Sequence, residues 1–366
     1  MKIFITGGAG FVGVNLAEHH LLAGHEVVIF DDLSRRGTAE NLAWLQEQHG
    51  RDALRTVVGD VRDFDALRSV FPTDTDRVYH MAAQVAVTTS VTDPRDDFEI
   101  NALGTFNVLE TIRERAPQAI LIYASTNKVY GGMESIPIVE TDTRYEYRDL
   151  VDGLTEEYPL DFHSPYGCSK GCGDQYVRDY ARIYGLRTVV MRQSCIYGPH
   201  QMGVEDQGWV AHFCIAARLN RPITIFGNGK QVRDVLWIDD LIAAYELAAG
   251  RIDECAGEIY NIGGGPANTV AVWSEFGPML ESLAGHPVPV TFDDWRPGDQ
   301  PLYISGIRKA ERELGWRPQI SFEEGLNRLW RWVDANTGLF EPAPAMNELT
   351  PDDSARDSLL FGHVSP

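Results

Sequence analysis

The sequence feature that most constrains the fold is a glycine-rich turn near the N-terminus. The apolar run Lys2–Thr6 is typical of a buried strand, and Phe11–Ala23 has the periodicity of a helix. Between and within them, Gly7 permits a tight turn, Gly10 lets the backbone approach a pyrophosphate, and Gly13 allows close packing of helix and strand. The free N–H groups of the helix N-terminus favour an anion at this place. The turn therefore predicts a dinucleotide-binding site, with an unliganded glycine turn as the alternative.

An acidic residue at the end of the next predicted strand narrows the choice of dinucleotide. The strand Glu26–Phe30 leads into Asp31, which Asp32 follows. A carboxylate there can accept hydrogen bonds from both ribose hydroxyls and would repel a 2′-phosphate. We therefore expect NAD rather than NADP. Arg35 and Arg36 leave open the alternative that they bind such a phosphate.

Short apolar runs alternate with helical patterns through the first half of the chain. After the first two strands, further strands are predicted at Leu54–Val57, Arg77–Met81, Ala119–Ser125 and Arg187–Arg192. Such alternation predicts an α/β fold, a doubly wound parallel sheet with helices on both faces. The ligand crevice of this fold lies at the carboxyl ends of the strands.

Proline and glycine interrupt the second half, which favours a smaller, interleaved C-terminal substrate domain. We predict an NAD-binding domain formed by residues 1–192 and 231–262, and a substrate-binding domain formed by 193–230 and 263–335. The composition of residues 338–366, rich in Pro, Ala, Asp and Ser, predicts a flexible tail, with docking on a neighbouring subunit as the alternative.

The charge balance limits the classes of partner. The chain of 366 residues carries 53 acidic and 32 basic residues, a formal net charge of −21. This acidity argues against nucleic acid and against an anionic membrane surface. No stretch is long and apolar enough to predict a membrane span, and the N-terminus does not resemble a signal peptide. The five cysteines, an odd number, favour reduced thiols and a cytoplasmic protein.

Tyr166 and Lys170 would lie on one face of a helix because they are four residues apart. A tyrosine acts as a general base only when its pKa, ordinarily about 10, is lowered. A positive charge about 4 Å away contributes roughly 4 kcal/mol at an effective dielectric of about 20, or about three pKa units before desolvation. Lys170 and an oxidised nicotinamide ring would both supply such charge. Ser125 or Thr126, at a strand end, could relay the proton of a reacting hydroxyl.

These motifs together resemble the extended short-chain dehydrogenase/reductase family of nucleotide-sugar enzymes. The resemblance covers roughly residues 1–335 and rests on the glycine turn, Asp31, the segments 80–83 and 125–131, and the pair Tyr166 and Lys170. It implies a Rossmann-type domain, tightly bound NAD, a nucleotide-diphospho-sugar substrate, and Thr126 at the position of the family's catalytic Ser/Thr. We therefore expect the catalytic residues to be Thr126, Tyr166 and Lys170.

The resemblance and the motifs give two further sets of expected contacts. The expected cofactor-binding residues are Gly7, Gly10, Phe11, Val12, Gly13, Asp31, Asp32, Ser34, Arg35, Asp60, Val61, Ala82, Ala83, Gln84, Asn101, Ser125 and Lys170. The expected substrate-binding residues are Gln84, Thr126, Asn127, Tyr166, Ser194, Cys195, Arg233 and Arg296. The family places arginines on the substrate pyrophosphate at the positions of Arg233 and Arg296. A salt bridge to a neighbouring acid is the alternative for both.

The residues after Thr126 bear on the reaction. The 4,6-dehydratases of the family carry Asp-Glu there, whereas this chain has Asn127 and Lys128, which disfavours dehydration. The segments 82–90, 125–131, 160–171, 206–210 and 227–236 resemble one branch, the CDP-paratose 2-epimerases. That resemblance implies inversion at C2 of a CDP-linked hexose or deoxyhexose through a 2-keto intermediate. The alternatives are a C4 epimerase or 4-reductase, and a non-catalytic NAD(H)-sensing protein.

Three further features complete the expectations. The acidic segment Glu134–Asp161 is either a lid or an arm packed against a second subunit, and a homodimer or higher homo-oligomer is expected. No metal site is expected, because Cys168 and Cys172 share a helix face without further ligands. Cys195 is either a pocket residue or a small core thiol.

Overall fold

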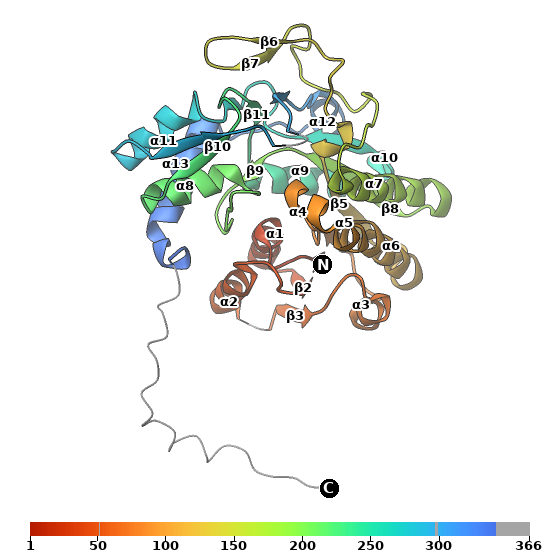
Figure 1. Cartoon of the computed structure of the whole chain (residues 1–366). Coiled ribbons are helices and arrows are strands. Elements are labelled where there is room, and N and C mark those ends of the chain that lie inside the picture. The colour runs from red at the N-terminus through yellow and green to blue at the C-terminus, as the bar shows by residue number, and fades with distance from the viewer. Residues whose placement is uncertain (51, 297–298, 342–366) are drawn as a thin grey trace, which may run out of the picture.

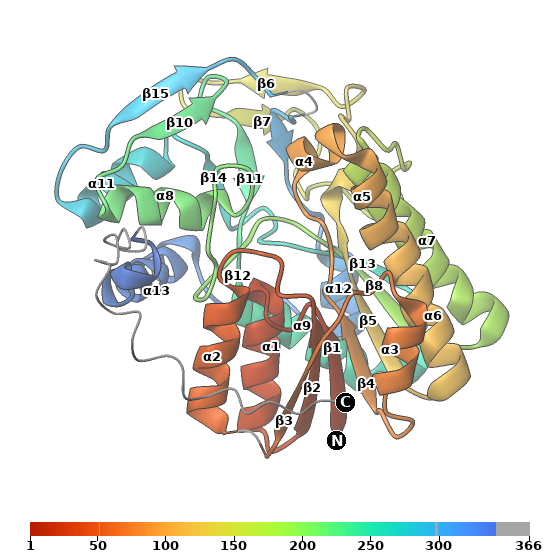
Figure 2. The ribbon, with the colours of Figure 1, turned by 60° about the horizontal axis from the view of Figure 1, so that its bottom comes forward.

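The main sheet forms the centre of the molecule. The computed structural model describes residues 1–50, 52–296 and 299–341. Within them, seven strands pair in the order β13-β8-β5-β4-β1-β2-β3, and every neighbouring pair is parallel (Figures 1 and 2). The strands are β1 (Lys2–Thr6), β2 (Glu26–Asp31), β3 (Leu54–Val58), β4 (Arg77–His80), β5 (Ile120–Thr126), β8 (Arg187–Gln193) and β13 (Ile259–Ile262).

The predicted Rossmann-type sheet is confirmed, and its first six strands end within one residue of the predicted positions. Strand β1 shows why the prediction succeeds. Ile3, Phe4 and Ile5 are all fully buried because helices cover both faces, so the strand is a continuous apolar run. Figure 2 shows α1, α2 and α9 over one face and α3, α6 and α7 over the other.

The helices fill the connections between strands. They are α1 (Phe11–Leu22), α2 (Thr38–His49), α3 (Phe64–Val70), α4 (Val87–Thr92), α5 (Pro94–Phe98), α6 (Gly104–Arg115), α7 (Pro165–Tyr184), α8 (Trp209–Arg218), α9 (Ile238–Gly250), α10 (Ile252–Cys255), α11 (Phe276–Ala284), α12 (Arg308–Leu314) and α13 (Phe322–Ala335). A π-helical turn η1 (Glu99–Leu103) and two 3-10 turns, η2 (Asn127–Tyr130) and η3 (Thr337–Leu339), are also present. In the described residues, no helix has the length and apolar character required to cross a membrane.

The second half of the chain builds smaller sheets above the carboxyl ends of the main strands (Figure 1). Strand β10 pairs with β15, β11 lies between β14 and β16, and β9 pairs with β12. Residues 231–262 were predicted to belong to the NAD-binding domain. Of these, α9 packs against the main sheet and β13 is one of its strands, whereas β11 pairs with β14 and β16 in a smaller sheet. The bounds are β9 (Ile196–Tyr197), β10 (Ile223–Phe226), β11 (Val232–Asp234), β12 (Leu236–Trp237), β14 (Thr269–Ala271), β15 (Val290–Asp293) and β16 (Leu302–Tyr303).

The acidic segment Glu134–Asp161 packs on its own chain. Its hairpin of β6 (Ile138–Glu140) and β7 (Tyr145–Tyr147) lies at the top of Figure 1. Lys230 O accepts a hydrogen bond from Tyr145 N at 3.1 Å, and Leu154 N donates to Ile304 O at 2.8 Å. These bonds join the hairpin and the segment after it to the smaller sheets.

The described chain ends in contact with the core. Phe340 is buried, its ring lies 5.8 Å from that of Trp332, and its carbonyl accepts a hydrogen bond from Arg221 at 2.8 Å. Residues 342–366, most of the tail predicted for 338–366, lie outside the described residues.

Candidate active site

The glycine turn after β1 forms a tight backbone cradle. Gly7 has a φ of +67°, and a Cβ added there would lie 2.5 Å from Ala82 N. A Cβ on Gly13 would lie 2.2 Å from Gly7 O, so the first turn of α1 packs directly on the strand end. The first helical bond runs from Val14 N to Gly10 O, and Gly10 offers no side-chain cap. The N–H groups of residues 11–13 therefore lack helical acceptors and can bind an anion.

Adding a methyl group at Gly13 should damage this cradle. We expect Gly13→Ala to weaken NAD binding by at least about tenfold, or ~1.4 kcal/mol, because the new Cβ would overlap Gly7 O. Gly250→Ala is a matched control, since no atom lies within 4 Å of its added Cβ. Fluorescence titration with NADH measures both variants. Equal affinities would show that the close approach at Gly13 does not shape the cradle.

Asp31, at the end of β2, braces the glycine turn. Its Oδ2 accepts a hydrogen bond from Ala9 N at 2.9 Å, and its Oδ1 accepts one from Leu33 N at 2.8 Å. Burial raises the pKa of Asp31, and these two N–H groups oppose the rise. Each oxygen keeps a further lone pair, which leaves Asp31 able to accept hydrogen bonds from ribose hydroxyls. Asp32 is exposed and accepts hydrogen bonds from the amide and hydroxyl of Ser34.

Asp60, one of the residues expected to bind the cofactor, has a partner within the chain. Asp60 Oδ2 accepts a hydrogen bond from Arg62 Nε at 2.8 Å, and Arg62 also pairs with Asp96 at 2.6 Å. The neighbouring Val61 is buried, and its carbonyl accepts a hydrogen bond from Asn107. The Asp60 carboxylate is thus oriented by Arg62, which leaves fewer of its lone pairs for a ligand.

Asn101 holds the loop after β4 in place. The residue is buried in η1, and its Nδ2 donates to Gln84 O at 3.0 Å, Asp97 Oδ1 at 3.1 Å and Ser169 Oγ at 3.1 Å. Its Oδ1 accepts a hydrogen bond from Gln84 N. Asn101 was expected to bind the cofactor directly. In the structure its side chain fixes the segment Ala82–Gln84, which borders the glycine turn, against α7, and its contact with the cofactor stays a prediction.

Thr126 and Tyr166 lie together at the carboxyl end of β5. Thr126 is the last residue of that strand, and Tyr166 is in the first turn of α7, after Pro165 and the N-cap Ser164. Their exposed fractions are 6% and 8%. Burial raises the pKa of Tyr166 to about 12, while the Thr126 hydroxyl and the charge of Arg35 act to lower it. The expectation of a lowered tyrosine pKa is therefore wrong for the chain by itself.

The position of Lys170 shows why its charge does not lower the pKa of Tyr166. Its Nζ lies 4.4 Å from the centre of the Tyr123 ring, and the side chain is 3% exposed. Burial lowers the pKa of Lys170 to about 7, opposed by Asp174 and Asp97. The ammonium thus lies over an aromatic face, and its charge is not among the influences that lower the Tyr166 pKa. No hydrogen-bond acceptor contacts Nζ in the described residues, so this buried donor is available to the hydroxyls of a bound ligand.

Ser125 belongs to a buried ionic network. Its Oγ donates to Asp174 Oδ2 at 2.7 Å, and Asp174 receives two hydrogen bonds from Arg192, at 2.8 and 2.9 Å. Arg192 also donates to Tyr130 Oη at 3.0 Å. Since this network holds its hydroxyl, Ser125 supports the strand end, and Thr126 is the hydroxyl beside Tyr166.

A polar cluster of Arg233, Lys128, Asp299 and Gln300 lies near Thr126, where the smaller sheets meet the end of β5. Arg233 Nη2 donates to Asp299 at 2.8 Å, and burial together with the charge of Arg233 lowers the pKa of Lys128 to about 8. Lys128 Nζ donates to Gln300 Oε1 at 3.3 Å. Burial raises the pKa of Cys195, and Arg233 and Lys128 oppose the rise. Cys195 therefore lies in this cluster.

Lys128 is absent from the residues expected to bind substrate. The sequence signal that could have found it is its position two residues after Thr126. In the structure it lies on η2, and it lines a small cavity together with Gly131 and His163. A half-buried ammonium next to Arg233 gives this side of the crevice a positive charge that suits an anionic ligand.

Three other expected substrate residues have protein partners. Ser194 Oγ donates to the buried Asp234 at 2.7 Å, and Arg296 pairs with Glu205 at 2.6 Å and Asp206 at 3.2 Å. Asn127 is buried beside Thr126, whose hydroxyl lies 3.4 Å from its Oδ1. To bind a substrate phosphate, Arg296 would have to release Glu205 and Asp206. Ser194, by contrast, supports the loop around Asp234.

Comparison with known proteins identifies the family. Residues 4–329 match the family described as GDP-mannose 4,6 dehydratase. The chain belongs to this family. It is also 42% identical to the CDP-paratose 2-epimerase of Salmonella typhi over 92% of this chain and 100% of that protein. With these relatives, the chain is a member of the extended short-chain dehydrogenase/reductase family, as its motifs predicted.

Solved structures in this extended family share the whole fold. DesIV, a dTDP-glucose 4,6-dehydratase from Streptomyces venezuelae solved with NAD and TYD bound, has a TM-score of 0.79 and 31% identity, over 93% of this chain and 99% of that chain. The UDP-glucose 4-epimerase of Thermotoga maritima, solved with UDP-glucose, has a TM-score of 0.77 and 29% identity, over 92% and 99% of the two chains. Members of one fold thus include both dehydratases and epimerases.

Proposed function

We propose that the protein is an NAD-dependent enzyme that inverts C2 of a CDP-linked hexose or deoxyhexose through a transient 2-keto sugar. The coarser activity, that of a nucleotide-sugar epimerase or dehydratase, follows from its relatives. The observation that carries the finer proposal is the pair of side chains that follows Thr126. An amide and an ammonium stand there, in a chain that matches a CDP-paratose 2-epimerase over that protein's whole length.

NAD fits the crevice. The backbone cradle at Gly7–Gly13 suits a pyrophosphate, and Asp31 retains lone pairs for the ribose. The Lys170 ammonium is a buried donor without an acceptor in the described residues, which suits ribose hydroxyls. Solved relatives contain NAD. When bound, NAD supplies the acceptor and then the donor of the C2 hydride.

The residues of the chain handle the proton and the orientation of the substrate. Tyr166 takes the proton of the C2 hydroxyl, and Thr126 donates a hydrogen bond to the same oxygen. The 2-keto sugar turns about its phosphate linkage and presents its other face. Tyr166 then returns the proton, so that proton and hydride are both restored. Arg233 and Lys128 hold the diphosphate side during this rotation.

The side chains beside Thr126 separate this reaction from dehydration. Eliminating water needs groups that protonate one carbon substituent and deprotonate the neighbouring carbon. Asn127 is an amide without acid–base function, so whatever proton Lys128 exchanges, the second group that elimination requires is missing from this pair. The site therefore suits a reaction in which one carbon is oxidised and reduced again.

An isotope experiment tests the proposal directly. CDP-paratose deuterated at C2 is incubated with the enzyme, and the product is analysed by NMR. We expect the inverted sugar to retain the label at C2, because the same hydride returns to the same carbon. A parallel reaction of unlabelled substrate in D₂O should introduce no deuterium at C2. Loss of label to the solvent would contradict the mechanism and indicate enolisation.

A substrate panel separates the remaining alternatives. CDP-paratose, CDP-glucose, UDP-glucose and GDP-mannose are compared, with inversion scored at C2 and at C4. We expect C2 inversion on a CDP-linked sugar. Inversion at C4 of UDP-glucose would replace the proposal by the activity named for UDP-glucose 4-epimerase relatives. NAD binding without turnover of any sugar would indicate a sensing protein.

A further inference from the structure

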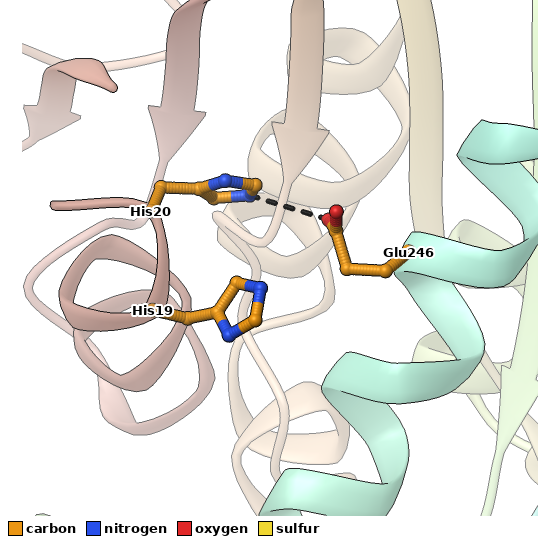
Figure 3. A group of neighbouring side chains, drawn as sticks. All are labelled: His19, His20 and Glu246. Carbon is orange, nitrogen blue, oxygen red and sulfur yellow. Dashed lines mark ion pairs between the residues drawn. The ribbon is translucent and has the colours of Figure 1, made fainter. Parts of the chain in front are cut away.

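A second group of chemically reactive side chains lies away from the crevice. His19 and His20 are in the last turn of α1, whose first turn borders the glycine cradle, and Glu246 projects toward them from α9. Figure 3 shows the three side chains converging from these two helices on a common space. None of them takes part in the proposed reaction.

The spacing of their polar atoms suits one metal ion. His20 Nε2 lies 3.4 Å from Glu246 Oε1, and one ligand atom from each of the three residues lies within 4.8 Å of the others. Two ligands on a tetrahedral zinc ion, with bonds of about 2.0–2.1 Å, are separated by about 3.3–3.4 Å. The pair formed by His20 and Glu246 already has this separation.

His20 also has a buried nitrogen without a partner. The side chain is 0% exposed, and its Nδ1 lies 3.2 Å from Nδ1 of His25. Nε2 has no hydrogen-bond partner among the described residues, although the Glu246 carboxylate is near. When His20 donates through Nδ1, a bare Nε2 lone pair faces a carboxylate oxygen. A cation between the two atoms would remove this repulsion.

The surrounding residues act as outer partners of such a site. Arg77 donates to Glu246 Oε2 at 2.7 Å, and Tyr79 donates to Oε1 at 2.5 Å. These bonds fix the orientation of the carboxylate and leave Oε1 with a second lone pair. The contact between His20 and His25 fixes the imidazole in the same way. Hydrogen bonds of this kind orient the ligands in protein metal sites.

We propose that His19, His20 and Glu246 bind one divalent cation of the zinc class. Two imidazoles and one carboxylate favour such a borderline ion over calcium or magnesium, which prefer oxygen ligands. Three protein ligands leave the fourth position to water. Because α1 and α9 supply the ligands, the ion would join two helices that cover one face of the sheet. The inference is independent of the proposed function.

Metal titration tests the site. The full chain is prepared without a histidine tag, stripped with a chelator, and titrated with Zn²⁺ by calorimetry and with Co²⁺ by visible absorption. We expect one equivalent of each metal to bind, with the intense bands of four-coordinate Co²⁺. Zn²⁺ should also raise the Tm, because it binds the folded state. Less than one equivalent, or the pale spectrum of octahedral Co²⁺, would overturn the proposal.

Two variants locate the binding. His19→Gln removes an exposed ligand and should leave the fold intact, while weakening Zn²⁺ binding at least about tenfold. His286→Gln, a change of the same type at an exposed histidine on the segment after α11, is the matched control and should bind like the unmodified chain. Equal affinity of His19→Gln and the control would place the ion elsewhere and overturn the proposal.

Discussion

Replacing Tyr166 by Phe should lower kcat by about 10²–10⁴-fold, the contribution typical of a general base. The change removes one hydroxyl from a buried site at the end of β5 and leaves the glycine cradle untouched. NAD affinity should therefore stay the same. Burial raises the pKa of Tyr166 to about 12, so the phenolate is the minor form at neutral pH. Turnover of the unmodified enzyme should accordingly rise with pH, and the residual turnover of the variant should not.

Tyr176→Phe is the matched control for this experiment. Tyr176 lies on the same helix, α7, but its side chain is exposed. The control should keep full activity and the same dependence on pH. Both variants are assayed for turnover of the CDP-sugar and for NAD binding by fluorescence. Full activity of Tyr166→Phe would exclude this phenol as the base, and loss of NAD from the variant would indicate a structural role.

The second large effect concerns stability. Asp174→Asn should lower the free energy of unfolding by about 3–5 kcal/mol, the usual cost of breaking a buried ion pair. Asp174 and Arg192 have side-chain exposures of 0% and 2%, and the two hydrogen bonds between them measure 2.8 and 2.9 Å. The asparagine would leave the Arg192 charge without a counter-charge in the core. Denaturant unfolding measures the loss as a lower midpoint.

An exposed ion pair provides the control for this prediction. Asp149→Asn makes the same chemical change at a pair in which Arg148 Nε lies 2.9 Å from the carboxylate, with exposures of 61% and 66%. An exposed pair of this kind contributes only about 0.2–1 kcal/mol. Similar unfolding midpoints for Asp174→Asn and Asp149→Asn would show that burial of the ion pair does not determine its contribution to stability. Ser125→Ala, which removes one hydrogen bond to Asp174, should fall between them.

The sequence predicts the main sheet well because its strands are buried on both faces. Strands β1, β2 and β5 each contain an uninterrupted run of three to five buried apolar residues, so local composition determines the strand. The smaller strands are harder to predict. Strand β11 contains the buried Arg233 and Asp234, and it pairs with β14 and β16, which are distant in the sequence. Its sheet depends on tertiary contacts that no local pattern encodes.

In the site, too, features set by nearby residues could be predicted, and features set by contacts between distant segments could not. Thr126 and Tyr166 could be placed together from motifs, because each stands at a defined end of a strand or helix. The direction of Lys170 toward the Tyr123 ring depends on packing between α7 and β5, so the expected contribution of Lys170 to a lower Tyr166 pKa is wrong for the chain by itself. Lys128 was missed for a similar reason. Its neighbours Arg233, Asp299 and Gln300 are about a hundred or more positions away.

The order of the strands in the main sheet also affects how the chain is made. Strand β13 covers the edge of β8, but residues 194–258 separate the two strands in the sequence. At about 5–20 residues per second, ribosomal synthesis leaves that edge without its neighbour for several seconds. The uncovered edge of β8 is then open to pairing with other nascent chains. Translation of residues 194–258 is therefore the interval in which this edge of the sheet has no neighbour of its own chain.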